Sequence, residues 1–143
     1  MKPFEAYHKE GIIRQGSRDP ERAKSMIRES ERKLRSLRFT REKIGITLDN
    51  ASDYVEQCYD LIMFLIRARL YLQGYSSAGR GSHEAEVAYL QTLHLPEKDI
   101  RFIDELRYLR NGVLYYGEPI DREYAEKVIA FTEKIVPQLK VKP

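Results

Sequence analysis

The sequence predicts an all-α protein, folded as an up-and-down antiparallel bundle of four to five helices. Apolar residues recur at helical spacing in consecutive segments, and short joins marked by glycine, proline or a capping residue separate those segments. No segment alternates between apolar and polar residues with the period of two that is typical of a strand. We therefore expect helices joined by short loops and packed around one core.

The length of 143 residues fits one domain. We expect residues 1–18 to form an N-terminal arm and residues 19–143 to form a single helical-bundle domain. A content of 42% hydrophobic and 33% charged residues is typical of a soluble helical protein. The longest apolar run, Leu61 to Ile66, is too short for a membrane span and no signal peptide opens the chain, so we expect a cytoplasmic protein without a membrane partner.

The first predicted helix begins at Asp19-Pro20, where an N-cap precedes a proline at the first helical position. Apolar residues then follow at helical spacing beside a stripe of arginines, until a break over residues 38–47 that Gly45 marks. The stretch from Arg14 to Lys43 holds eleven lysines and arginines against five acids. This basic third of the chain is suited either to facing phosphate or to forming a solvated helix face.

Asp49 or Asn50 can cap the next and longest helix, which we expect to run to about Gln73. Its apolar residues extend nearly around the cylinder, so this helix should be the central and most buried one. Cys58 lies on its apolar face and is therefore expected to be a small buried residue rather than a nucleophile.

A glycine-rich loop over residues 74–81 ends the central helix, and Ser82 caps a short helix that follows. His83 falls in the first turn of this helix, where we expect it at the surface. The single cysteine excludes a zinc site built on several thiolates, and the three histidines lack the spacing of metal ligands. We expect neither a metal nor a cofactor.

Pro96 opens a further helix that Gly117 and Pro119 stop, and Asp121 starts the last one. Near the end of the Pro96 helix, Arg110 shares a stripe with Ile103, Leu106 and Val113, which lie at offsets of −7, −4 and +3. A charge among apolar residues requires a partner, because an unpaired buried charge costs several kcal/mol.

Arg110 could have one of three kinds of partner: an acid, a second subunit, or an anion in a cleft. Acids of the same helix, namely Asp99, Asp104 and Glu105, are candidates. A simple interaction of the guanidinium with the helix dipole is the alternative that requires no function.

The order of these helices resembles the HEPN family (higher eukaryotes and prokaryotes nucleotide-binding domain) over about residues 19–140. A long helix carrying Tyr54 leads to Gly74-Tyr75, a polar loop and a short helix that begins Ser82-His83; a further helix ends Leu109-Arg110-Asn111, and a final helix follows Gly117. Members that cut RNA are metal-independent ribonucleases and symmetric dimers, in which an Arg-x4-6-His motif from each subunit meets at a shared cleft.

Carried over onto this chain, the resemblance aligns Arg110 with the family arginine and Asn111 with the polar residue after it. Tyr115, Tyr116 and Gly117 fill the places five, six and seven positions on, so no histidine falls in the window. In toxins paired with a minimal nucleotidyltransferase, the modified tyrosine lies two places beyond the histidine, where this chain has Gly117. The resemblance thus implies a degenerate catalytic set of Arg110, Asn111 and Tyr115. The candidate ligand-binding residues are Arg110, Asn111, Tyr116 and the nearby Arg107.

A tyrosine is a poor substitute for the missing histidine. With a reference pKa near 10 it is ionised to roughly one part in a thousand at pH 7, whereas a histidine accepts protons near neutrality. It can still stack on a base or donate to phosphate. The resulting hypothesis is a homodimeric HEPN-type protein that binds RNA or a nucleotide within a toxin-antitoxin or defence module, beside a nucleotidyltransferase, with catalysis weak or lost. The alternatives are a non-catalytic protein-interaction or dimerisation subunit, and an active metal-independent endoribonuclease that uses tyrosine.

Overall fold

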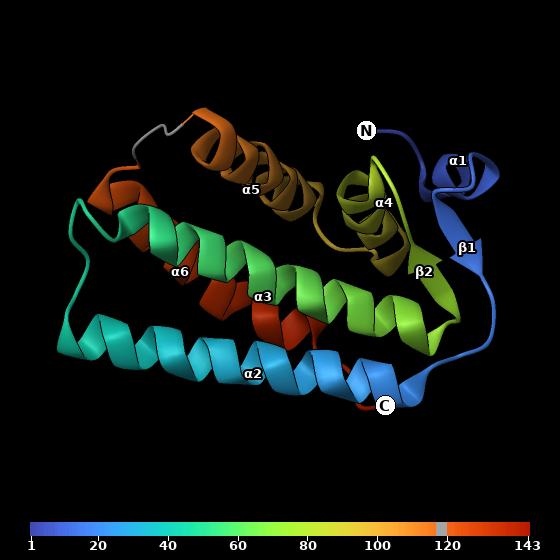
Figure 1. Cartoon of the computed structure of the whole chain (residues 1–143), viewed down its shortest axis with the longest axis horizontal. Helices are drawn as coiled ribbons and strands as arrows, with labels where there is room; N and C mark the ends of the chain where they lie inside the picture. The colour runs from blue at the N-terminus through green and yellow to red at the C-terminus, as the bar shows by residue number, and fades with distance from the viewer. Residues whose placement is uncertain (117–119) are drawn as a thin grey trace.

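The computed structural model describes the chain except residues 117–119 and the side chains of residues 113–116. The described part is mostly helical, which confirms the all-α class (Figure 1). Its elements are α1 (Phe4–Lys9), β1 (Ile13–Gln15), α2 (Pro20–Lys43), α3 (Ala51–Leu72), β2 (Tyr75–Ser77), α4 (Ser82–Tyr89), a 3₁₀ turn (Leu90–Leu93), α5 (Glu97–Tyr116) and α6 (Arg122–Leu139).

Helix α3 forms the centre of the molecule, as predicted. Twelve of its 22 residues are buried, and it packs against α2, α4, α5 and α6. Cys58 lies fully inside, where burial raises the pKa of its thiol to about 12. The expectation of an inert, buried cysteine is therefore confirmed.

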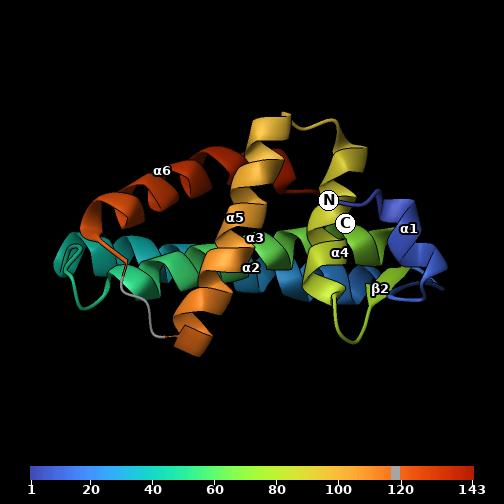
Figure 2. The same cartoon turned by 90° about the horizontal axis from the view of Figure 1, so that it is seen from above.

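The helices run in two directions. Helices α2 and α3 are antiparallel neighbours along the long axis, as expected for an up-and-down pair, and α6 runs lengthwise behind α3 (Figure 1). Helices α4 and α5 instead cross this axis on top of α3, which the view from above makes plain (Figure 2). Among the described residues, the crossing leaves one side of α3 without a helix over it, between α2 below and α4 and α5 above.

Helix α2 is longer than the sequence indicated, and it exceeds α3 in length. Its start is correct, since the Asp19 carboxylate accepts a hydrogen bond from the Arg22 backbone N–H at 3.1 Å. The break expected from residue 38 begins only after Lys43. Arg38 holds the extra turns on the bundle, because it donates to Glu133 of α6 at 2.9 Å while Leu37 beside it is buried.

The N-terminal residues form part of the packed structure. Tyr7 and Ile13 are buried in the common core, and β1 pairs antiparallel with β2, with Ile13 opposite Ser77. This small sheet corrects the expectation that the chain contains no strand. Strands of three residues are too short to show an alternation of apolar and polar residues in the sequence. They form because the two segments pair with each other in the folded chain.

Candidate functional site

The side of α3 that no helix covers carries a stripe of polar and aromatic residues. Asp60, Phe64, Arg67 and Tyr71 lie at offsets of 0, 4, 7 and 11, which places them on one face of the helix. All four are only partly buried, whereas their neighbours from Leu61 to Leu70 are buried except for Arg69. We call these four residues the α3 stripe.

A cleft of about 310 Å³ opens over the C-terminal half of the α3 stripe. Phe64, Arg67 and Tyr71 form its floor, Arg22 of α2 lies on one side, and His83 and Glu86 of α4 lie on the other. Cations face both aromatic rings: the Arg22 guanidinium lies 4.7 Å from the Tyr71 ring centroid, and the Lys33 ammonium lies 5.7 Å from that of Phe64. The cleft thus combines π-faces with positive charge.

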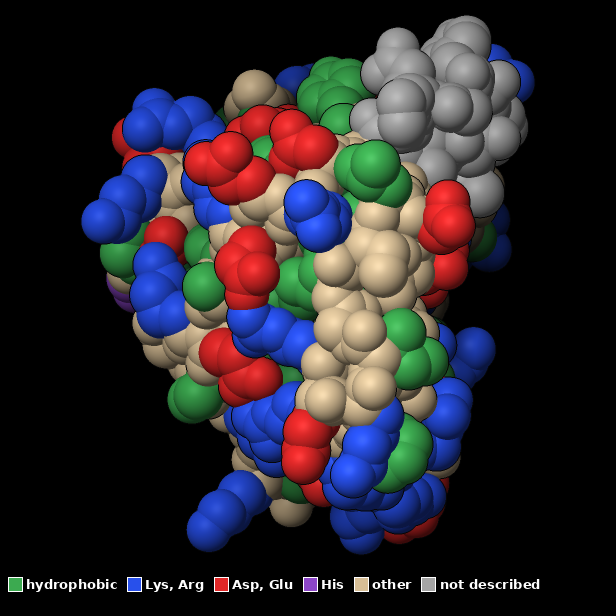
Figure 3. Space-filling model, turned by 90° about the vertical axis from the view of Figure 1, so that its left-hand side faces the viewer, with side chains coloured by type: hydrophobic (Ala, Val, Ile, Leu, Met, Phe, Trp, Pro, Cys, Tyr) green, Lys and Arg blue, Asp and Glu red, His purple; other side chains and the backbone are tan. Residues whose placement is uncertain are grey.

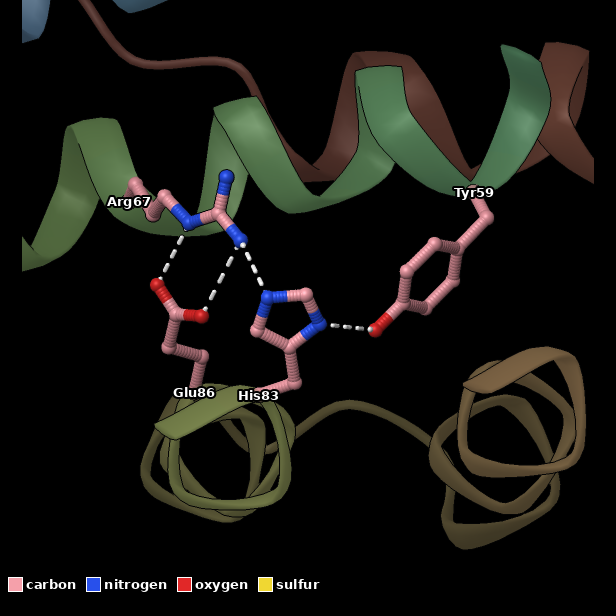
Figure 4. A network of polar contacts seen from close by, with 4 residues as sticks. All are labelled: Tyr59, Arg67, His83 and Glu86. Carbon is pink, nitrogen blue, oxygen red and sulfur yellow. Dashed lines mark hydrogen bonds and ion pairs between the residues drawn. The ribbon is translucent and has the colours of Figure 1, made fainter. Parts of the chain in front are cut away.

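A buried ion pair fixes the wall of this cleft. Arg67 donates from Nε to Glu86 Oε2 at 2.6 Å and from Nη2 to Oε1 at 3.2 Å (Figure 4). The Glu86 side chain is only 2% exposed, while that of Arg67 is 24% exposed. The bidentate geometry compensates the buried carboxylate, and Arg67 also lines the cleft.

His83 joins the pair to Tyr59. Its Nε2 lies 3.3 Å from Arg67 Nη2 and its Nδ1 lies 3.2 Å from the Tyr59 hydroxyl (Figure 4). Because a guanidinium can only donate, Nε2 must accept, and the proton of the neutral ring is then on Nδ1, which donates to Tyr59. The expectation of an exposed His83 is wrong, because the first turn of α4 packs onto α3 and half-buries the ring.

Desolvation by burial lowers the pKa of His83; the charges of Glu86 and Asp60 oppose this shift, and those of Arg67 and Arg110 add to it. The folded protein therefore binds fewer protons at this site than the unfolded chain does. We expect the free energy of unfolding to fall as the pH drops below about 6.5, the reference value of the unfolded ring. Urea denaturation at pH 7.5, 6.5 and 5.5 measures this slope.

The matched variants for that measurement are His83→Gln and His94→Asn. The first removes the titrating ring and should flatten the acid-side decline, while the second leaves it in place. An acid-side slope in His83→Gln as steep as in the wild type would assign the effect to other groups.

Arg110 reaches the other end of the α3 stripe. Its Nε lies 3.4 Å from Asp60 Oδ1, and its guanidinium lies 5.5 Å from the Tyr59 ring centroid. The ion pair is loose, since Nε is buried yet makes no hydrogen bond, and a quarter of the side chain remains exposed. Of the three kinds of partner left open by the sequence, the structure shows an acid, and this acid belongs to α3 rather than to the arginine's own helix.

Those acids of α5 are engaged elsewhere. Asp104 accepts from Arg107 Nε at 2.9 Å, Asp99 accepts from Lys134 at 2.9 Å, and Glu105 accepts from the Tyr124 hydroxyl at 3.2 Å. A helical wheel of α5 cannot predict these pairings, because two of the three partners, Lys134 and Tyr124, belong to α6.

The remaining predicted site residues separate into three groups. Arg107 is 12% exposed and paired with Asp104, with its guanidinium 4.4 Å from the Tyr108 ring centroid. Asn111 is exposed. The side chains of Tyr115 and Tyr116 lie outside the described residues. Of the predicted set, the structure thus brings only Arg110 to the stripe.

Comparison with protein-family models, curated proteins and solved structures gives no match for this chain. The HEPN resemblance stays a prediction from the residues quoted for it. Within the described part of the chain, no helix has both the length and the apolar character needed to cross a membrane. Among the same residues, histidine, cysteine, aspartate and glutamate side chains form no group of three that could hold a metal ion.

Sequence reasoning missed Tyr59, Arg67, His83 and Glu86. One signal was present for Arg67, a charged residue in the otherwise apolar run from Leu61 to Ala68. A charge at such a position requires a partner for the same physical reason as Arg110 does. The other three appear as ordinary helix residues until α4 is placed on α3.

Proposed function

We propose that this protein binds RNA or a nucleotide through the cleft over the α3 stripe and the adjoining Arg110. The observation that carries the proposal is the convergence of four cations on the long face of α3 that reaches solvent in the described structure: Arg22, Lys33, Arg67 and Arg110. Glu86 and Asp60 offset the charges of Arg67 and Arg110, so the net positive charge at this face comes from Arg22 and Lys33, while the two paired guanidinium groups keep further N–H donors. Guanidinium groups suit phosphate oxygens because they offer several donors in a planar fork. Aromatic rings beside such cations provide stacking surfaces for bases.

The other lysines and arginines of residues 14–43 add less positive charge near the cleft than their number suggests. Figure 3 shows lysines and arginines gathered at the lower edge of the molecule, where α2 ends. Two of the arginines in this part of α2 are already neutralised, since Arg38 pairs with Glu133 and Arg41 with Glu126. Arg22 lies at the opposite end of α2, where it is exposed beside the cleft.

The wider setting of the proposal comes from the resemblance. A cytoplasmic homodimer of HEPN type, in a toxin-antitoxin or defence module beside a nucleotidyltransferase, accounts for the helix order and for the Arg110-Asn111 pair. Catalysis is weak or absent in this proposal, because tyrosine is a poor base. Tyr59 is ionised even less at neutral pH than a free tyrosine, because burial raises its pKa to about 12.

Filter binding of RNA tests the proposal. Arg110→Ala should bind several-fold more weakly than the wild type, and the slope of log affinity against log salt should become shallower by about 0.7 for one lost phosphate contact on a single strand. Arg35→Ala, which removes an exposed arginine of α2, is the matched control. Equal affinities and slopes for wild type and Arg110→Ala at every salt concentration would exclude Arg110 from the site.

A protein-interaction subunit is the second candidate, and a separate groove favours it. A hollow of about 830 Å³ lies beside α5, lined by Ile100, Glu105 and Tyr108, and Tyr108 is 64% exposed. Size-exclusion chromatography distinguishes the two functions. Loss of a dimer in Tyr108→Ala, which alters this groove, with no RNA or nucleotide bound by the wild type, would favour the interaction subunit.

A further inference from the structure

We infer that the cleft over the α3 stripe takes a single-stranded oligonucleotide, in preference to a mononucleotide or a duplex. This inference rests on the proposed function and names the substrate class for the same site. It follows from the spacing of the two aromatic rings on the cleft floor and from the cations that accompany them.

Phe64 and Tyr71 lie seven residues apart on one face of α3, which separates them by about 10.5 Å along the helix axis. Stacked bases in a strand follow one another at about 3.4 Å. A single base therefore cannot contact both rings, and neither can two neighbouring bases that remain stacked. A ligand that uses both rings must be a strand of at least two nucleotides with its bases spread apart.

The cations follow the same spacing. Phe64 has the Lys33 ammonium 5.7 Å and the Arg67 guanidinium 5.9 Å from its ring centroid, and Tyr71 has the Arg22 guanidinium at 4.7 Å. Lys33 and Arg22 come from α2, which runs antiparallel to α3 along the cleft (Figure 1). Each ring thus has a cation over it, so a base that stacks on that face has to move the cation aside, where its charge stays within reach of a phosphate. Grooves for single strands combine aromatic rings and cations in this way.

A duplex cannot use this arrangement. Its bases are paired and stacked inside, so that it presents phosphates, sugars and groove edges to a protein. The rings of Phe64 and Tyr71 are partly buried on the floor of a cleft of about 310 Å³. A double helix would contact only the rim cations and leave both rings without a base.

Competition binding with RNA of increasing length tests the inference. The probe is a fluorescently labelled single-stranded RNA of eight nucleotides, and the competitors are AMP, UMP, and unlabelled RNA of two, four and eight nucleotides, together with a duplex of the same sequence. Anisotropy should show at least a ten-fold gain in affinity from mononucleotide to four nucleotides, and at least ten-fold weaker competition by the duplex than by the eight-nucleotide strand.

Two ring variants place the effect at the cleft. Phe64→Leu and Tyr71→Leu should each weaken binding of the eight-nucleotide strand by about ten-fold, which is within the range found for loss of one base–aromatic stack. Phe39→Leu and Tyr108→Leu remove rings that are 64% exposed outside the cleft and should leave the affinity unchanged. Thermal melting verifies that the variants fold. The competition series uses only the wild type, so it tests the inference even if a variant does not fold.

The outcomes separate the inference from the proposed function. A mononucleotide that competes as well as the eight-nucleotide strand, or a duplex that competes equally, would overturn the inference and leave binding of a phosphate-bearing ligand intact. Failure of the labelled strand and of every competitor to bind would overturn both.

Discussion

Replacing Arg67 by methionine should lower the free energy of unfolding by about 3–5 kcal/mol, the cost typical of removing one partner of a buried ion pair. Methionine keeps the length and flexibility of the side chain but leaves the Glu86 carboxylate, which is 2% exposed, without its two charge-assisted hydrogen bonds. His83 also loses the donor to its Nε2. Urea denaturation followed by circular dichroism at pH 7.5 measures the change.

Two further variants show whether the stranded carboxylate causes the loss. Adding Glu86→Gln to Arg67→Met removes the buried charge and should recover part of the lost stability, a non-additive result expected for residues in contact. Arg35→Met, on the exposed side of α2, should change stability by no more than about 0.5 kcal/mol. If Arg67→Met and Arg35→Met were equally stable, the ion pair would contribute nothing to the fold.

The parts of the fold that follow local rules were predictable. The starts of α2 and α6 follow from Asp19 and Asp121, whose carboxylates accept from backbone N–H groups three residues on, at 3.1 and 2.7 Å. The burial of α3 follows from apolar residues on most of its surface. Each of these features depends on residues within a few positions of one another, which is the range that a sequence pattern covers.

The candidate site depends on long-range placement. The pairs Arg67–Glu86 and Tyr59–His83 join residues 19 and 24 positions apart, and Arg110 meets Asp60 across 50 positions. Helix α4 has eight residues, too few for a pattern to specify which side faces α3. The apolar stripe around Arg110 correctly indicated that this charge requires a partner, but only the packing of α5 across α3 identifies Asp60 as that partner.

Placing alanine at Gly74 should destabilise the protein by about 2–5 kcal/mol, because two costs combine there. The backbone at Gly74 has φ +81°, a left-handed conformation that costs other residues about 1–2 kcal/mol. A Cβ at this position would also collide with the carbonyl oxygen of Gly16, and the Gly16 N–H donates to the Gly74 carbonyl at 2.7 Å. Overpacking of this kind typically costs about 1–3 kcal/mol more. Thermal and urea denaturation measure the total.

Gly79→Ala separates the two costs. Gly79 has the same φ of +81°, but a Cβ there would meet no atom within 4 Å, so this variant should lose only the conformational part of about 1–2 kcal/mol. The difference between the two variants then measures how tightly the segment after β1 is held against the end of α3. Because β2 begins one residue after Gly74 and leads into α4, a loosened contact should also reduce the ordering of His83 and Glu86 at the cleft. Equal losses in Gly74→Ala and Gly79→Ala would mean that this contact yields freely and that the N-terminal segment does not support the site.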